Sequence, residues 1–453
     1  MSGHCVRWAF GTPVMDLTCL CSALLLQSTS LAAVTTVPQN TIGNAVPATS
    51  AASPGGSAQD ANTPHSGQPS GSRIEWRNGS PVLVSADGGT TLRPLGQLIV
   101  DIASTNGASD HLRNRRDSDV RAAHLGFAGT VANALVYQVE TEFAGSDPDI
   151  LWAYVGWRGK IAGVGADVLA GNLQNDRSVE GSSGGEALPF AEPNFVASAI
   201  APDRGGLGLG AQARLIGTTW HASFAVTGND LDARHPQTDS RMILARAHWN
   251  PIKRTGAILH LGAWTFDEKF TGGTRTLGAN TNVAYGLNLR TVLPSPPLPG
   301  ATGDRGVGLE AGGVLGPVWM MGEAGRRRID LPQEDARTTA KSLSAGWFVT
   351  GQAPVYAAAT GSIGRPSVRR SVFQGGSGQV ELTTRYEDIQ FNMPGFRNTG
   401  SSVTGGVNWY LSSLMRVMVN ATAWRMAPDR QMTGTGPHTD HGTTFVLRTQ
   451  IVF

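Results

Sequence analysis

The chain has very little cysteine, and Cys5, Cys19 and Cys21 all lie within the first 21 residues. Residues 22–453 therefore offer no thiol for a disulfide, for nucleophilic catalysis or for a thiolate metal site. Leu17–Ala33 (LTCLCSALLLQSTSLAA) is apolar and ends in small residues, which is typical of a secretory signal peptide cleaved near Ala32 or Ala33. We predict a signal peptide at residues 1–33, and therefore a mature chain without cysteine.

Charge is scarce as well. Only 15% of residues are charged, where a soluble domain usually has about 25%. The chain has 36 basic and 34 acidic residues, for a net charge of +2, and this near balance argues against a protein that coats nucleic acid. Glycine is abundant, at 58 residues. This composition favours an all-β protein with many turns, or a membrane barrel, over a helix-rich soluble enzyme.

Beyond the predicted signal peptide, the sequence contains no apolar run long enough for a transmembrane helix. Residues 34–72 consist mainly of Pro, Ser, Gly, Ala and Thr, and Asp60 is their only charged residue. Such a segment cannot bury enough apolar surface to order itself, so we predict a flexible linker. From residue 73 to 453 the composition stays uniform, without a second linker or a repeat, which indicates one domain.

The main signal in residues 73–453 is an alternation of apolar and polar residues with period two. In Val136–Phe143, for example, Val139 and Phe143 share one face while Glu140 and Glu142 share the other. The same alternation occurs at 220–227, 243–249, 283–290, 380–386, 403–411, 415–420 and 445–453. Strands of a soluble β-sandwich alternate in the same way, so the pattern alone leaves that fold open.

The segments between the strands favour a membrane barrel. Short turns alternate with longer polar stretches such as Gln174–Glu186 and Thr271–Asn282, and aromatic residues such as Trp157, Trp249 and Trp409 lie near strand ends. This combination is the signature of an outer-membrane barrel. Sixteen strands would use roughly 24 residues per strand and connection, a reasonable value for a porin-sized barrel. We predict an all-β, transmembrane antiparallel barrel of about 16 strands.

Several motifs, taken in order, resemble the phosphate-selective porin O and P family. They are VRAAHLGFAG at Val120–Gly129, LPFAEPNFVASAIAPDRG at Leu188–Gly205, ILHLGA at Ile258–Ala263, ELTTRY at Glu381–Tyr386, GGVNWYL at Gly405–Leu411 and LRTQIVF at Leu447–Phe453. The resemblance implies that Leu188–Gly205 is an inward constriction loop. It also implies a passive channel for small anions such as phosphate, without catalysis or cofactor, that forms a homotrimer in the outer membrane of a Gram-negative bacterium.

If the apolar side of each strand faces lipid, arginines and histidines line the interior. Guanidinium groups bind phosphate or carboxylate through paired hydrogen bonds and stay charged at any pH. By alternation the inward positions include Arg246, Arg290, Arg385, Arg416 and Arg448, with Arg214, His124, His221 and His248 on the same side. The resemblance places Arg204 near the narrowest point. The predicted anion-binding, pore-lining set is Arg204, Arg214, Arg246, His124, Arg385 and Arg416.

Each of these assignments has an alternative. The glutamates Glu140, Glu142, Glu310, Glu323 and Glu381 also point inward, so the arginines could belong to balanced charge pairs that stiffen the wall. Arg204 could instead anchor its loop by bonding to Glu192 or Asp203. At the level of the whole protein, the alternative is a plugged barrel that acts as a surface-binding protein or an outer-membrane enzyme.

Two further clusters bear on partners and metals. The run Arg326-Arg327-Arg328 is expected at a loop or strand end, where it would meet anionic lipopolysaccharide or solvent at the outer-membrane surface. His438 and His441 lack a third ligand close in sequence, so no metal site is predicted there.

Overall fold

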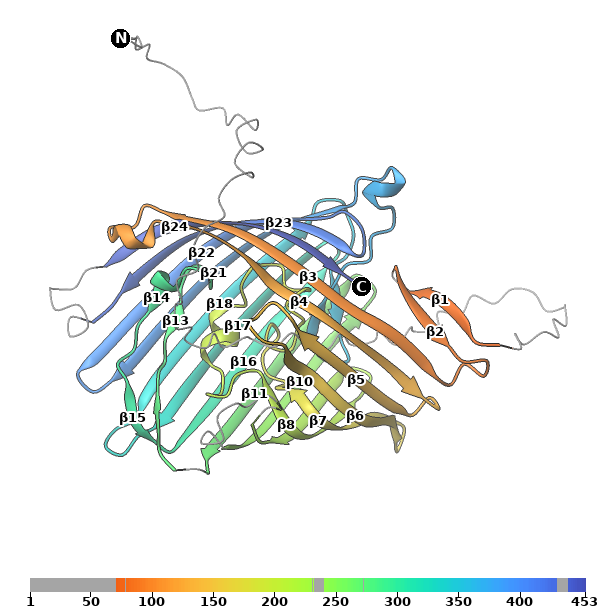
Figure 1. Cartoon of the computed structure of the whole chain (residues 1–453), viewed down its shortest axis with the longest axis horizontal. Coiled ribbons are helices and arrows are strands. Elements are labelled where there is room, and N and C mark those ends of the chain that lie inside the picture. Colours follow the sequence, from red (N-terminus) through yellow and green to blue (C-terminus); the bar gives the residue numbers. More distant parts are fainter. Residues whose placement is uncertain (1–70, 78, 230, 232–239, 272, 430–438) are drawn as a thin grey trace, which may run out of the picture. The chain divides into compact units, whose positions relative to one another are not determined.

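The computed structural model describes residues 71–77, 79–229, 231, 240–271, 273–429 and 439–453. The predicted signal peptide and nearly all of the predicted linker lie outside these residues. Sixteen antiparallel strands form a closed barrel, as predicted (Figure 1). They are β3 (Thr91–Asn106), β4 (Arg116–Val131), β5 (Leu135–Glu142), β6 (Asp149–Ile161), β7 (Val164–Gln174), β8 (Leu207–Ile216), β9 (Trp220–Thr227), β10 (Ser240–Arg254), β11 (Ala257–Phe270), β16 (Gly303–Leu315), β17 (Val318–Asp330), β18 (Ala336–Phe348), β21 (Gln379–Met393), β22 (Phe396–Tyr410), β23 (Met415–Ala427) and β24 (Asp440–Val452). Pairing of β24 with β3 closes the ring.

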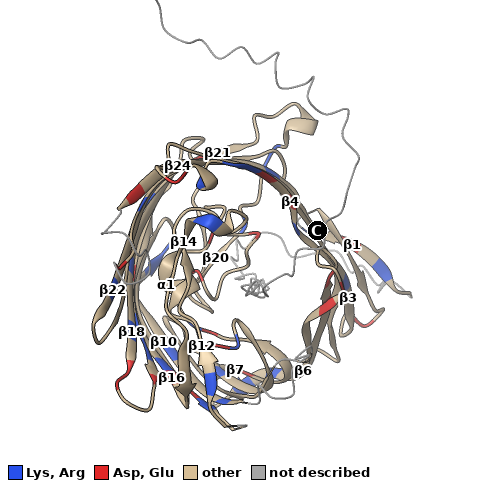
Figure 2. Cartoon of the chain, turned by 60° about the vertical axis from the view of Figure 1, so that its left-hand side comes forward, with Lys and Arg blue, Asp and Glu red and all other residues tan. Residues whose placement is uncertain are grey.

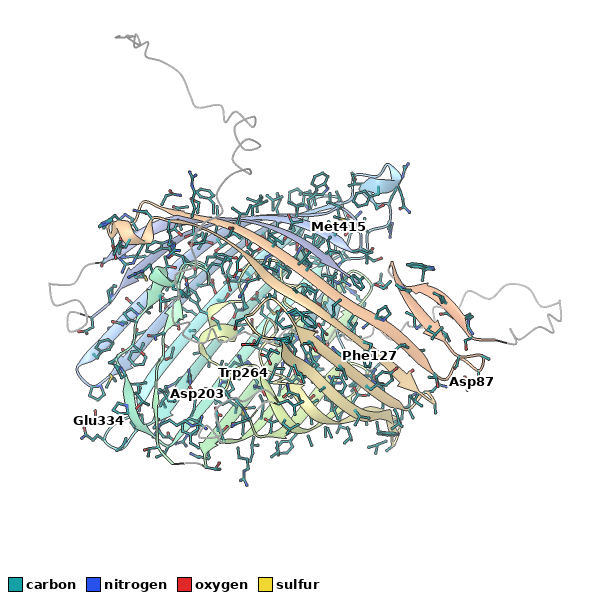
Figure 3. All side chains as sticks on the ribbon, viewed as in Figure 1. Asp87, Phe127, Asp203, Trp264, Glu334 and Met415 are labelled. Atoms are coloured by element: carbon teal, nitrogen blue, oxygen red, sulfur yellow. The ribbon has the colours of Figure 1, made fainter. Side chains whose placement is uncertain are left out.

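The predicted alternation is confirmed along the barrel strands. On β5, Gln138 and Glu140 are buried on the inner face, whereas Val139 and Leu135 are exposed on the outer face. Phe127 of β4 is likewise exposed, and Figure 3 labels it among the side chains that cover the strands. An apolar outer face and a polar inner face are what a barrel in lipid requires. No helix of the described chain is long and apolar enough to cross a membrane.

Tryptophans form a band on the outer face at one end of the barrel. At this end the strands are joined by short turns, such as residues 132–134, 162–163 and 316–317, and we call it the short-turn end. The exposed members of the band are Trp157, Trp220, Trp249, Trp347 and Trp409. Such a band is expected where the barrel meets the membrane–water interface. Trp152 does not belong to it, because its side chain is buried on the inner face.

Three long segments fold into the barrel. Residues 175–206, with α1 (Phe195–Ala199), and residues 271–302 enter from the end opposite the short turns, which we call the long-loop end. The second of these contains β12 (Arg275–Leu277), β13 (Thr281–Asn282), η4 (Leu289–Thr291), β14 (Val292–Leu293) and β15 (Leu298–Ala301). Residues 349–378 enter from the short-turn end and contain β19 (Val355–Ala357), β20 (Ser362–Gly364) and η5 (Val372–Gln374). Figure 2 shows α1, β14 and β20 inside the ring of strands. The predicted inward loop, Leu188–Gly205, is therefore confirmed as part of 175–206.

The predicted strand at 283–290 is wrong. These residues belong to the inserted segment 271–302, where Val283 and Tyr285 are buried and Arg290 is exposed in η4. Their alternation arises because one side of the segment packs against the inner wall. An alternation with period two shows that a segment has one apolar face. It does not show whether that face packs against lipid or against the inner wall of the protein.

A small hairpin precedes the barrel. It consists of β1 (Arg73–Arg77) and β2 (Ser80–Val84), and β2 pairs with the start of β3 at Leu83↔Leu92. Val82 and Val84 are buried, whereas Ile74 and Trp76 are exposed. The barrel wall itself starts at Thr91, after this hairpin.

Candidate functional site: the charged interior

Two arginines share one carboxylate on the inner wall formed by β6, β7 and β8. Arg158 donates from Nε to Asp167 Oδ1 at 2.9 Å and from Nη2 to Oδ2 at 3.0 Å. Arg214 donates from Nη2 to the same Oδ2 at 2.8 Å. The three residues are register partners across neighbouring strands. Among the described residues, these contacts set two guanidinium groups against one carboxylate, which is a local excess of positive charge.

Arg93 of β3 adds to this excess. The strand pairing places Arg93 level with the inward-facing residues Gln138 and Tyr154, so it also faces inward. Its guanidinium has no ion-pair partner within the described chain. Sequence reasoning missed both Arg93 and Arg158. For Arg158 a signal existed, because Arg158 and Asp167 are equidistant from the two-residue turn Ala162–Gly163 and therefore lie opposite each other in a hairpin.

Arg246 of β10 joins two inserted segments to the wall, and its side chain is fully buried. It donates to both oxygens of Glu310 on β16, at 2.9 Å each. It also donates to Asp176 Oδ1 of segment 175–206 at 2.8 Å, and to the carbonyl oxygens of Thr360 and Gly361 in segment 349–378, at 2.8 Å each. All of these acceptors belong to the protein, so Arg246 holds the inserted segments to the wall. Sequence analysis predicted that it lines the pore.

Arg385 and Arg416 also hold segment 175–206. Arg385 of β21 donates to Glu180 Oε1 at 2.6 Å and to the Glu192 carbonyl at 2.8 Å, and its guanidinium lies 3.9 Å from the centre of the Phe190 ring. Arg416 of β23 donates to the Leu188 carbonyl at 2.7 Å. Both side chains are buried at the positions that alternation predicted, under the loop.

His124 of β4 lies between two carboxylates. Its Nδ1 is 3.0 Å from Glu140 Oε1 and its Nε2 is 2.7 Å from Glu142 Oε2. The predicted inward position is correct, and the ring belongs to a charge cluster of the wall.

Arg204 lies where segment 175–206 rejoins the wall. It donates to the carbonyl and hydroxyl oxygens of Thr227 on β9, at 3.2 and 2.8 Å, and its Nε is 3.8 Å from Glu268 Oε1. Sequence analysis considered Glu192 and Asp203 as partners of Arg204. Glu192 instead contacts Arg121 at 3.3 Å, and Asp203 contacts Arg275 at 3.4 Å.

Electrostatics stabilise the segment that Arg246 holds. Burial by itself would raise the pKa of the Asp176 carboxyl, but the neighbouring Arg246 guanidinium outweighs burial and holds that pKa below its ordinary value. Burial lowers the pKa of Arg177 to about 10, so Arg177 remains charged at neutral pH. It donates to the Ala197 and Ile200 carbonyls at the C-terminal end of α1, at 2.8 and 3.3 Å.

The described residues contain no group of His, Cys, Asp and Glu side chains arranged to hold a metal ion. His438, which was considered with His441, lies outside the described residues.

Comparison with known families decides the identity of the barrel. The model of the family described as phosphate-selective porin O and P matches residues 96–453. The chain belongs to this family. It is thus a porin, an outer-membrane channel of the Gram-negative type. Comparison with curated protein sequences gives no match.

Solved porin structures share the fold. In vitro folded OmpT, an outer-membrane protein of Vibrio cholerae, is 12% identical with a TM-score of 0.51, over 81% of this chain and 98% of that one. The anion-selective porin from Comamonas acidovorans is 14% identical with a TM-score of 0.50, over 80% of this chain and all of that one. At these identities the likeness establishes the barrel architecture alone.

Proposed function

We propose that the porin passes small anions, phosphate among them, in preference to cations. The observation that carries this proposal is the pair Arg158 and Arg214 on the single carboxylate of Asp167, with Arg93 on the same inner wall. Charges that line a narrow water-filled passage select ions by sign. The anion selectivity of the Comamonas porin with the same fold agrees with this proposal.

We propose a division of labour among the predicted site residues. Arg214 acts on the passing anion, because it shares the carboxylate of Asp167 with Arg158. Arg246, Arg385 and Arg416 act mainly through the inserted segments that they hold. His124 lies between two carboxylates, and its charge is therefore offset locally.

The test is the reversal potential of the purified porin in a planar bilayer with a KCl gradient. We expect the native channel to prefer chloride, and Arg214→Ala to shift the reversal potential toward cation preference. Arg116→Ala is the matched control, because Arg116 is exposed at the long-loop end of β4 and faces outward. The shift should shrink as salt rises, because exposed charges are screened over about 8–10 Å at physiological ionic strength. A native channel that prefers potassium would overturn the proposal.

A plugged barrel is the second candidate, and the three inserted segments favour it. Such a protein would bind a ligand at its surface and conduct no ions. Single-channel recording separates the two: discrete current steps in KCl support the channel, and their absence with correctly folded protein supports the plugged barrel.

We further propose export by the signal peptide at residues 1–33, and assembly as a homotrimer. The trimer form solved for Vibrio cholerae OmpT supports this assembly. Light scattering of the detergent-solubilised porin tests it, with a mass of three chains expected.

Lipopolysaccharide is the proposed lipid partner. Near the long-loop end the outer face carries the exposed arginines Arg326, Arg328, Arg337, Arg397 and Arg425, whereas Arg327 turns inward to Asp304. A cationic outer surface of this kind fits the phosphates of the outer leaflet. Co-purification of lipopolysaccharide should fall when Arg326 and Arg328 are both replaced by Gln.

A further inference from the structure

One stretch of segment 349–378 is basic and exposes an aromatic ring. The segment contains three arginines and no Asp or Glu. Two of these arginines, Arg369 and Arg370, are exposed, and the side chain of Phe373 in η5 is 67% exposed. We call residues 369–377 the rim tip. No acidic side chain of its own segment offsets the positive charge of the rim tip.

The rim tip lies at the outer edge of the short-turn end. The Ser377 carbonyl accepts a hydrogen bond from Trp409 Nε1 at 2.9 Å, and Trp409 belongs to the tryptophan band on the outer face. Val372 N donates to the Leu411 carbonyl at 2.9 Å, where β22 turns toward β23. Figure 1 shows η5 in light blue, projecting from the barrel. The rim tip is therefore close to the region where the barrel meets the membrane–water interface.

Local hydrogen bonds hold the rim tip in a defined turn. Ser371 N donates to Gln374 Oε1 at 3.3 Å, and Gly375 ends η5 with a φ of 73°, a conformation that favours glycine. Arg370 Nε donates to the Gln374 carbonyl at 3.2 Å, which keeps this guanidinium in the same turn. The fold thus presents Phe373 and two guanidinium groups together within a few residues.

We propose that the rim tip binds anionic phospholipid in the periplasmic leaflet of the outer membrane. Short turns of outer-membrane barrels face the periplasm. An aromatic side chain beside basic residues is the composition of segments that lie in a membrane interface. Phe373 enters the interface near the tryptophan band, and Arg369 and Arg370 bind the lipid phosphate, because guanidinium groups pair with phosphate oxygens. Free phosphate offers the same oxygens but nothing to the aromatic ring.

The position of the rim tip is tested in vesicles of phosphatidylglycerol that contain the porin. Phe373→Cys places a single thiol within residues 22–453, which have no cysteine of their own, and the thiol is labelled with a polarity-sensitive fluorophore. We expect blue-shifted emission that is quenched by lipid with a nitroxide at its headgroup. Arg290→Cys is the control, because Arg290 is exposed within segment 271–302, and its label should emit as in water. A label at residue 373 that the nitroxide lipid does not quench overturns the proposal, since the rim tip then meets water, a second copy or another protein.

The role of charge is tested by lipid affinity. The porin in neutral detergent is titrated with short-chain phosphatidylglycerol and with the matching phosphatidylcholine, and bound lipid is counted by native mass spectrometry. Arg369→Gln with Arg370→Gln should weaken phosphatidylglycerol binding about 25-fold, roughly fivefold for each arginine, and phosphatidylcholine binding much less. Both side chains are exposed, so the variant should fold.

The matched control is Arg115→Gln with Arg116→Gln, an adjacent exposed pair at the long-loop end, which should bind both lipids as the native porin does. Equal phosphatidylglycerol affinity of the rim-tip variant and the native porin contradicts the proposal. Inorganic phosphate is added in a competition at the same concentration as the lipid. If it displaces phosphatidylglycerol fully, the arginines form a site for free anions and the lipid assignment is wrong.

Discussion

The ring of Phe453 lies over Gly96 at the seam where the barrel closes. A Cβ at residue 96 would be 2.1 Å from Phe453 Cζ, so the ring occupies the space that any side chain there would need. The two residues also exchange backbone hydrogen bonds, Gly96 N to Phe453 O at 3.1 Å and Phe453 N to Gly96 O at 2.9 Å. The end of the chain thus completes the pairing of β24 with β3.

This seam makes Phe453 important for assembly. Deletion of Phe453, or Gly96→Val, should lower the amount of folded barrel, the latter by an overpacking cost of about 1–3 kcal/mol. Heat-modifiable mobility on gels measures the folded fraction, and unit conductance of the protein that does fold should be unchanged. Gly405→Ala is the control, because a Cβ at Gly405 meets no atom within 4 Å. Normal yield of both seam variants would contradict this role.

Removal of Arg246 should release two inserted segments at once. Arg246→Ala leaves the buried carboxylates of Glu310 and Asp176 without their cation, and the loss of one partner of a buried ion pair costs about 3–5 kcal/mol. We expect faster limited proteolysis within both 175–206 and 349–378, and noisier channel currents. Arg337→Ala, an exposed change on β18, should leave both readouts at the native level. If segment 349–378 resists proteolysis equally well in Arg246→Ala, then Arg246 does not hold this segment.

The ion pair between Arg246 and Asp176 should be stable to mild acid. The pKa of Asp176 is held below its ordinary value of 3.8, so its contribution to stability is fully present above that value and is lost only as the pH falls below it. Proteolytic protection of segment 175–206 should therefore be constant from pH 8 to about pH 5. Asp176→Asn should weaken the protection at neutral pH. Release of the segment between pH 7 and 6 in the native porin would show that another group controls it.

Arg204→Ala should affect the loop more than ion preference. Because Arg204 bonds to Thr227 and lies beside Glu268, its loss should loosen the junction of segment 175–206 with β8 and raise current noise. The shift in reversal potential should be smaller than that of Arg214→Ala, measured in the same KCl gradient. A larger shift for Arg204→Ala would give it the selective role that sequence analysis proposed.

The wall of the barrel could be predicted from the sequence because lipid imposes a strict requirement on each strand. Residues such as Val139 and Glu140 alternate since their faces meet hydrocarbon and water, and the length of the chain is compatible with the 16 strands observed. The inserted segments were less predictable. Tyr285 is buried against Asp101 of β3, a contact between residues far apart in the sequence that no local pattern encodes.

The same reason limits prediction of the site. Alternation correctly placed Arg246 and Arg385 on the inner face, but it cannot tell which inward arginines a segment covers. That depends on where 175–206 and 349–378 dock, through contacts such as Arg385 with Glu180. Arg158 was detectable from its hairpin pairing with Asp167. The place of Arg93 on the same inner wall could be seen only once the order of all the strands was known.

The contacts of Arg246 link the two mouths of the channel. Segment 175–206 enters from one mouth and segment 349–378 from the other. Arg246 contacts both, and the segments also contact each other directly, since Ile363 N donates to Ser183 Oγ at 2.8 Å. A pull on either segment is therefore transmitted to the other. A displacement of one segment at its own mouth would therefore strain contacts that hold the segment from the opposite mouth.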